Sequence, residues 1–113
     1  MHEFSLAADV VELAAREAEK HAVSRILEMD IEVGALSGVD ADAFREALKL
    51  VVENTLLSQT VIRLNRKSGR GICPSCRREF EMKERIAFCP DCGELPSEIT
   101  GGLEFRVVSL LAE

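Results

Sequence analysis

Residues 27–40 read LEMDIEVGALSGVD, and this stretch decides the fold. Over its first seven positions, apolar residues alternate with acidic ones, a period of two that is typical of a strand with one buried face. The apolar members are Leu27, Met29, Ile31 and Val33. Gly34 and Gly38 then bracket a turn, and Asp40 follows at a position where its carboxylate can cap a helix. The stretch therefore predicts a strand, a turn and a helix start.

The segments on both sides of this stretch have a helical period. After Asp40, one apolar stripe repeats at three and four residues. Its members are Phe44, Ala47, Leu48, Val51, Val52 and Thr55. Residues 4–21 show the same spacing opposite a charged face. Its apolar members are Leu6, Val10, Leu13 and Ala14. Two amphipathic helices are predicted.

Two further strands complete the predicted sheet. Residues 60–65 place Ile62 and Leu64 on one face. Near the C-terminus, apolar residues alternate with Glu104 and Arg106. The apolar residues are Leu103, Phe105, Val107 and Leu111. We therefore expect an α+β fold, with two helices packed on a small three-stranded sheet.

A cysteine-containing segment lies between the last two of these strands, so we expect it to be an insertion. The predicted division is a discontinuous domain of residues 1–68 plus 97–113 and an inserted lobe of residues 69–96. Glycines and a proline at both ends of the lobe are plausible hinges. They are Gly69, Gly71, Pro96, Gly101 and Gly102.

The composition is that of a globular protein. The chain has 113 residues, of which 47% are hydrophobic and 30% charged, and its net charge is -6. No apolar run approaches the roughly 20 residues that a membrane span needs, and no secretory signal is visible. We expect a cytoplasmic protein with no membrane partner. The net charge also argues against a nucleic-acid partner.

Charge is nevertheless unevenly distributed. Residues 66–88 contain seven basic and three acidic residues, a local charge of 7 − 3 = +4. Two interpretations are open for this basic cluster. It could offset a negatively charged metal centre, or it could form a surface for nucleic acid.

The four cysteines occupy two C-P-x-C knuckles. They are Cys73, Cys76, Cys89 and Cys92. Two such turns can complete a tetrahedron of thiolates, which suits Zn²⁺. The same ligands fit iron, and spacing alone does not separate the two metals. Four protein ligands leave no position for water, so the site is predicted to be structural. Gly93 follows the second knuckle, where the backbone often needs a positive φ, and Arg77 takes that place after the first.

The chain begins MHE, which permits two interpretations. A histidine at position 2 can simply belong to a frayed end. Alternatively, the terminal amine, the backbone nitrogen of His2 and its imidazole can form fused chelate rings, and such planar nitrogen donors suit Ni²⁺ or Cu²⁺. His21 is expected to be a solvated residue at a helix end.

Taken together, four stretches resemble the HypA/HybF family, the nickel metallochaperones of [NiFe]-hydrogenase maturation. They are MHEFSL at 1–6, EVGALSGVD at 32–40, ENTLL at 53–57 and the paired knuckles. The resemblance implies a nickel carrier with a zinc lobe inserted before the last strand. It also implies nickel ligands at Met1 and His2, a role in nickel binding for Glu3, and a position near the nickel for Asp40. The four cysteines would bind zinc.

The resemblance further implies a HypB-type GTPase and the hydrogenase large subunit as partners, and some family members also serve urease. We expect a monomer or a weak homodimer. No nucleophile with a paired base and no phosphate-binding loop is present, so no enzyme is predicted. Two other hypotheses remain: a zinc-ribbon module that binds a nucleic acid or a protein, and an iron-dependent electron carrier.

Overall fold

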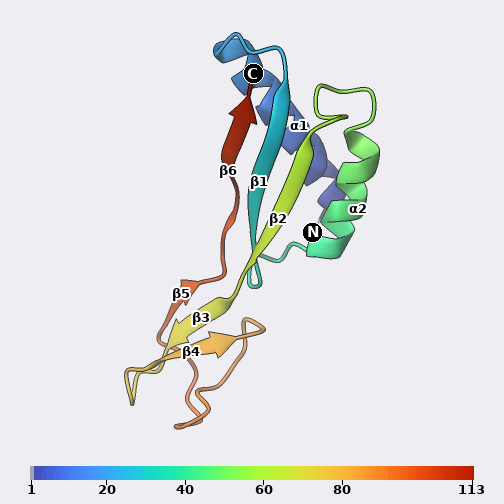
Figure 1. Cartoon of the computed structure of the whole chain (residues 1–113). Helices are drawn as coiled ribbons and strands as arrows, with labels where there is room; N and C mark the ends of the chain where they lie inside the picture. The colour runs from blue at the N-terminus through green and yellow to red at the C-terminus, as the bar shows by residue number, and fades with distance from the viewer. Residues whose placement is uncertain (1) are drawn as a thin grey trace.

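The computed structural model describes residues 2–113 and contains two units arranged end to end, each built around a three-stranded sheet (Figure 1). The elements in chain order are α1 (Glu3–Lys20), β1 (Ile26–Gly34), α2 (Ala41–Val51), β2 (Val61–Lys67), β3 (Gly69–Ile72), β4 (Glu79–Met82), β5 (Glu98–Gly101) and β6 (Phe105–Ala112). In the described part of the chain, neither helix has the length and apolarity needed to cross a membrane.

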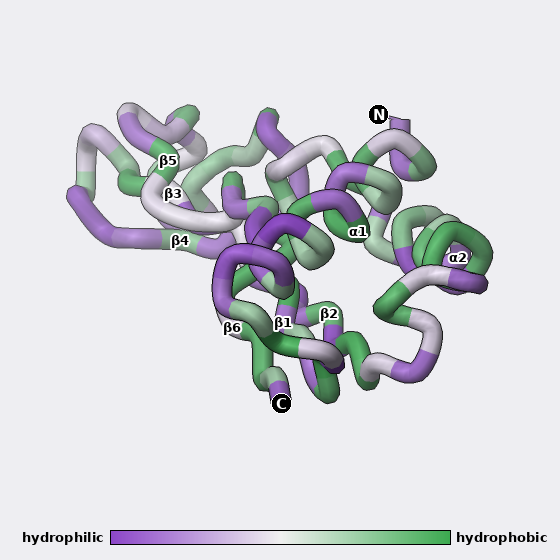
Figure 2. Tube along the Cα trace, turned by 90° about the horizontal axis from the view of Figure 1, so that it is seen from above, coloured by the Kyte–Doolittle hydropathy of each residue, from purple (hydrophilic) through white to green (hydrophobic). Residues whose placement is uncertain are grey.

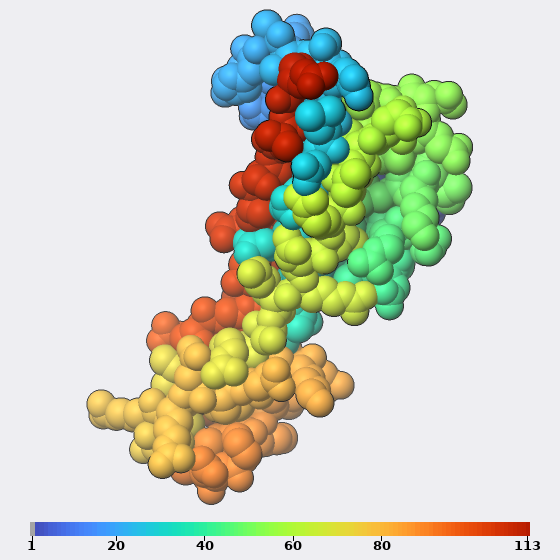
Figure 3. All heavy atoms as spheres, in the orientation of Figure 1, coloured from blue at the N-terminus to red at the C-terminus, as the bar shows by residue number. Residues whose placement is uncertain are grey.

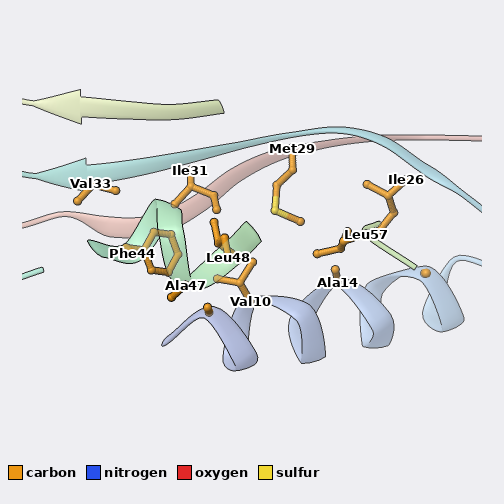
Figure 4. Close-up of a cluster of buried hydrophobic side chains, with 12 residues drawn as sticks. Val10, Ala14, Ile26, Met29, Ile31, Val33, Phe44, Ala47, Leu48 and Leu57 are labelled. Atoms are coloured by element: carbon orange, nitrogen blue, oxygen red, sulfur yellow. The ribbon is translucent and has the colours of Figure 1, made fainter. Parts of the chain in front are cut away.

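The larger unit has the predicted α+β architecture. Its sheet has the order β2-β1-β6, with β2 parallel and β6 antiparallel to β1. Both helices lie on one face of this sheet, and the apolar side chains of β1 point toward them (Figure 4). Seen from above, hydrophobic and hydrophilic positions alternate along the helices and strands, as amphipathic elements require (Figure 2).

The other face of the sheet is covered by ion pairs rather than by helices. Arg63 of β2 contacts Asp30 at 2.8 Å, and Glu32 lies 2.7 Å from Arg106 of β6 and 3.3 Å from Lys67. Glu28 and Asp30 thus pair with Arg63 of β2, and Glu32 lies between basic residues of both neighbouring strands. This arrangement explains how a half-buried strand accommodates three carboxylates.

Helix α1 packs through smaller residues than the periodicity predicted. Its buried residues are Ala7, Val10, Ala14 and Ala18. Leu6 and Leu13, which were expected on the buried face, are only half-buried. The alanine row lets the helix axis approach the sheet closely, and the leucines then lie at the edge of the contact. Across the core, the rings of Phe44 and Phe105 form an edge-to-face pair with centroids 5.1 Å apart.

Two irregularities interrupt the pairing of β1 with β6. The register passes from Ile26 to Glu28 and, on β6, from Val107 to Ser109, so Leu27 and Val108 are extra residues. Each bulge reverses the side-chain alternation locally. Ile26 is therefore buried where Leu27 was expected. Leu110 packs against the core, and Leu111 is 52% exposed.

The inserted segment forms a second sheet of order β4-β3-β5, which the sequence analysis did not predict. It has a small core, to which Leu36 of the turn between β1 and α2 also contributes. The buried members are Leu36, Cys73, Phe80, Met82 and Cys89. Strand β5 belongs to this sheet, although residues 97–113 were predicted to join the first unit. The division into two domains stays a prediction, and the strand pairing extends the second unit, here called the lobe, to Gly101.

The two units meet at a narrow waist built from close backbone contacts (Figure 3). A Cβ atom on Gly34 would lie 2.1 Å from the carbonyl oxygen of Gly102, so only glycine fits there. The amide of Leu36 donates to the same carbonyl at 2.7 Å. Gly102 was expected to be a hinge at the C-terminal end of the lobe. Its backbone instead packs tightly against Gly34.

Candidate metal sites

The four cysteines of the lobe converge on one point. Their Sγ atoms all lie within 4.8 Å of one another, and those of Cys76 and Cys89 are 3.8 Å apart. Zn–S bonds of about 2.3 Å in a tetrahedron require S···S separations of about 3.8 Å. A disulfide needs about 2.0 Å. All four thiols are free, so the cluster fits a tetrahedral metal ion rather than a disulfide.

The two knuckles have the same local structure. The amide of Arg77 donates to the carbonyl of Cys73 at 2.9 Å, and the amide of Gly93 donates to that of Cys89 at 2.8 Å. Arg77 has a φ of +62° and Gly93 a φ of +70°. The expected positive φ at Gly93 is confirmed, and Arg77 adopts the same conformation in spite of its Cβ. Local turn geometry thus positions both pairs of thiols.

Crowding of the thiols favours a bound cation. The backbone N–H groups of Cys76 and Ser75 donate to the Cys73 sulfur and lower the pKa of that thiol to about 7. In contrast, the interaction with Cys76, burial and the nearness of Cys73 raise the pKa of Cys92 to about 12. A group of thiols so close together cannot all ionise in the absence of a positive charge, and a divalent ion at their centre would remove this penalty.

The basic cluster is largely neutralised. Arg70 contacts Glu79 at 3.0 Å and Arg78 contacts Asp91 at 3.3 Å. Arg66 and Lys67 pair with carboxylates of the larger unit. Four of the seven basic residues between positions 66 and 88 are therefore paired with acids. This pairing weakens the interpretation of the cluster as a nucleic-acid surface.

The N-terminal residues lie beside the start of α2. His2 is the exposed residue that precedes α1, and Glu3 is the first residue of the helix. The Glu3 Oε2 atom accepts a hydrogen bond from the amide of Asp40 at 3.3 Å. The structure thus brings together two of the residues assigned to the nickel site, although 37 positions separate them. Met1 lies outside the described residues.

Asp40 also caps α2. Its Oδ1 atom accepts from the amides of Asp42 at 3.0 Å and Ala43 at 3.1 Å, as the sequence predicted. Two helices consequently begin at the same place, and each helix start carries partial positive charge. The carboxylates of Glu3 and Asp40 offset this positive charge. Without them, the two helix starts would repel a cation bound near His2.

Leu36 connects the surroundings of the two candidate sites, and sequence reasoning missed it. This residue lies in the turn between β1 and α2, yet it is only 2% exposed and packs in the lobe core beside Cys73 and Cys89. Asp40 follows four residues later. The available signal was a large apolar side chain inside a glycine-bracketed turn, where an exposed leucine would be unfavourable.

His21 takes no part in either site. It follows the last residue of α1, and its Nε2 atom lies 3.3 Å from a carboxylate oxygen of Glu17. Its side chain is 65% exposed. This is the solvated position at a helix end that was expected.

Comparison with known proteins decides the family. The family described as "Hydrogenase/urease nickel incorporation, metallochaperone, hypA" matches residues 1–112. This chain belongs to the HypA family. HypA proteins are metallochaperones, so the expectation that this chain is not an enzyme is confirmed.

Relatives match over nearly their full lengths. The hydrogenase maturation factor HypA of Geobacter metallireducens is 35% identical over 113 residues, which is all of both chains. That of Rhizobium leguminosarum bv. viciae is 32% identical over 107 residues, 95% of each chain. The solution structure of the nickel metallochaperone HypA from Helicobacter pylori has a TM-score of 0.67 at 24% identity, covering 99% of this chain and 97% of that one. This structural likeness confirms the HypA fold.

Proposed function

We propose that this chain binds Ni²⁺ at its N-terminus and delivers it during the maturation of [NiFe]-hydrogenase, while a structural Zn²⁺ ion holds the lobe. The family match over residues 1–112 carries this proposal. The nickel ligands are the amine of Met1 and the backbone nitrogen and imidazole of His2. The zinc ligands are Cys73, Cys76, Cys89 and Cys92.

The local structure supports a nickel site at this end of the chain. The first N–H groups of an α-helix have no acceptor within the helix, and the first helical hydrogen bond of α1 runs from the Leu6 amide to the His2 carbonyl. The backbone nitrogen of His2 is therefore not needed by the helix. Glu3 and Asp40 supply negative charge beside it. Ni²⁺ bound through a deprotonated amide is displaced as the pH falls, because protons compete for the same nitrogens.

The partners and location follow from the same proposal. Nickel passes from this carrier, together with a HypB-type GTPase, to the hydrogenase large subunit. Urease maturation proteins are a second recipient, since the family description includes urease. We expect a cytoplasmic protein that is a monomer or a weak homodimer.

Nickel titration of the untagged, zinc-loaded protein tests the ligand assignment. The chain has two histidines, so His21→Ala is a matched control for His2→Ala. We expect His2→Ala, or a short extension before Met1, to weaken nickel binding more than about tenfold, with zinc content unchanged. His21→Ala should bind like the wild type. Full affinity in the extended protein would exclude the amine as a ligand.

The charge of the two carboxylates can be tested separately from their structural contacts. Glu3→Gln keeps an oxygen that can accept from the Asp40 amide, and Asp40→Asn keeps a good helix cap. Both variants should therefore retain the melting temperature but bind nickel several-fold more weakly. Unchanged nickel affinity in both would show that these carboxylates only shape the backbone.

Metal analysis tests the identity of the metal in the lobe. We expect one zinc ion per chain and a colourless protein, and Cys73→Ser should lose the metal. A coloured, redox-active preparation would instead support the iron hypothesis.

A further inference from the structure

The larger unit has two free sheet edges, and they are not equivalent. Strand β6 carries a bulge at Val108 and faces another at Leu27 of β1, and such irregularities discourage the addition of a further strand. Strand β2 pairs with β1 in continuous register over Val61–Lys67. Among residues 2–113, no strand pairs with its outer edge. Strand β2 is therefore the more regular of the two open edges of the larger unit.

A groove runs along this edge between β2 and α2. It has a volume of about 240 Å³. Four apolar side chains line it, and they are Leu48, Val52, Ile62 and Leu64. Arg45 and Lys49 line the side formed by α2. An additional strand along β2 would direct every second side chain into this groove.

The charges around the groove determine what can occupy it. On β2 itself, Arg66 points to the same side as Ile62 and Leu64, where it pairs with Asp42 of α2. Arg45 and Lys49 have side chains that are 46% and 63% exposed, and each already lies near an acid of its own helix. Three basic residues and two acids, Asp42 and Glu46, thus surround the apolar groove, a local charge of 3 − 2 = +1 on a protein whose net charge is -6.

A second copy of the chain does not fit this edge. Strand β2 contains Arg63, Arg66 and Lys67 and no acidic residue. Two paired β2 strands would carry six basic residues and no acidic residue, so neither strand offers an acid to the cations of the other. The complementary occupant carries acidic residues instead.

We propose that the β2 edge and its groove bind an extended segment of a protein partner, in which two apolar side chains at alternate positions are flanked by acidic residues. The segment adds to the sheet as a fourth strand. Its apolar side chains contact Leu48, Ile62 and Leu64, and its carboxylates lie near Arg45 and Lys49. This surface is independent of the proposed nickel and zinc ligands.

Two model peptides test the proposal on the full, zinc-loaded chain. The first is Glu-Thr-Val-Thr-Val-Thr-Glu with blocked ends, whose valines and glutamates share one face of a strand. The second replaces both glutamates with lysines. Amide NMR spectra should shift in β2 and α2 with the acidic peptide only. No binding at millimolar peptide, equal binding of the basic peptide, or shifts centred on β6 would overturn the proposal.

Charge reversals on the two helices provide a matched comparison. Arg45→Glu and Lys49→Glu should each lower the affinity for the acidic peptide about three- to tenfold at low salt. Arg16→Glu on α1 is the control, because Arg16 is 68% exposed and also pairs with an acid of its own helix, at 3.6 Å. An equal loss in Arg16→Glu, or dimerisation of the wild type through β2, would contradict the proposed site. Unperturbed spectra of the free variants show that they fold.

Discussion

Leu36 is a residue of the larger unit that completes the core of the lobe. Its neighbours there are few, because the cluster has only five buried members. A small core depends strongly on each of them. The side chain also holds the turn that leads to Asp40, so the position of that turn depends on the lobe.

Leu36→Ala tests this dependence. The substitution should reduce the free energy of unfolding of the metal-loaded protein by about 2–5 kcal/mol, because it removes a buried side chain and leaves a cavity. Metal release to a chelator should also become faster. Denaturant titration measures the first effect. Leu50→Ala, at a position that is 59% exposed, is the control and should have little effect. Equal stabilities of the two variants would show that Leu36 does not anchor the lobe.

Arg77 and Gly93 occupy equivalent places after the two knuckles but differ in conformational cost. A residue with a Cβ atom in the left-handed region costs about 1–2 kcal/mol relative to its ordinary conformation. Arg77→Gly should therefore stabilise the metal-loaded protein by about 1 kcal/mol, and Gly93→Ala should destabilise it by a similar amount. No atom lies within 4 Å of the added Cβ at Gly93, so a clash would not contribute. Thermal unfolding measures both. A loss of stability in Arg77→Gly would mean that the side chain of Arg77 makes a contact that stabilises the protein by more than the backbone strain costs.

The carboxylates on the exposed face of β1 form ion pairs with basic residues of both neighbouring strands. Hydrogen bonds from Arg63 and Ser109 hold the pKa of Asp30 well below its usual range. The hydrogen bond from Arg106, followed by that from Lys67, lowers the pKa of Glu32. The sheet therefore prefers both carboxylates ionised.

This preference predicts how the sheet responds to acid. The unfolded chain binds protons on Asp and Glu near pH 4, whereas these two groups bind them only at lower pH in the folded sheet. Their stabilising contribution is therefore complete above about pH 5 and declines as the pH falls further. Asp30→Asn should lower stability at neutral pH and flatten the decline below about pH 5. Unfolding measured at several pH values checks this, and an unchanged pH dependence in Asp30→Asn would contradict it.

The strands also show how far sequence alone could predict this fold. Long amphipathic elements such as α1, α2 and β1 were predictable because their periodicity is local. Bulges at Leu27 and Val108 were not, since a bulge depends on how two distant strands pair. Strands β3, β4 and β5 have four residues each, too few for a period to appear.

The same distinction between local and long-range features applies to the two candidate sites. Each cysteine pair lies within one turn, so its spacing predicted the cluster. The contact between Glu3 and Asp40 joins residues that only the folded chain brings together. Periodicity did not reveal it, and the family resemblance alone pointed to it.

At the level of the whole chain, the two units should differ in their need for metal. The larger unit buries a core of twelve residues, eleven from both helices and β1 and one, Leu57, from the loop between α2 and β2. The lobe has a much smaller core that includes two of the cysteines. Removing the metal with a chelator should therefore unfold β3, β4 and β5 and leave the larger unit folded. NMR spectra report the two units separately, and an intact lobe without metal would contradict this expectation.

The place of the lobe in the chain affects how the larger unit assembles. Strands β2 and β6 lie on opposite sides of β1, and the lobe is the connection between them. Where the chain enters and leaves the lobe, the backbones of Gly69 and Gly102 touch, since a Cβ on Gly102 would lie 2.5 Å from the Gly69 Cα atom. A lobe that folds first shortens the loop that β6 must close to roughly a tenth of its length. Because closure entropy depends on the logarithm of loop length, this saves about 2 kcal/mol. The metal supply of the cell thereby influences the folding rate of a unit that contains none of the cysteines.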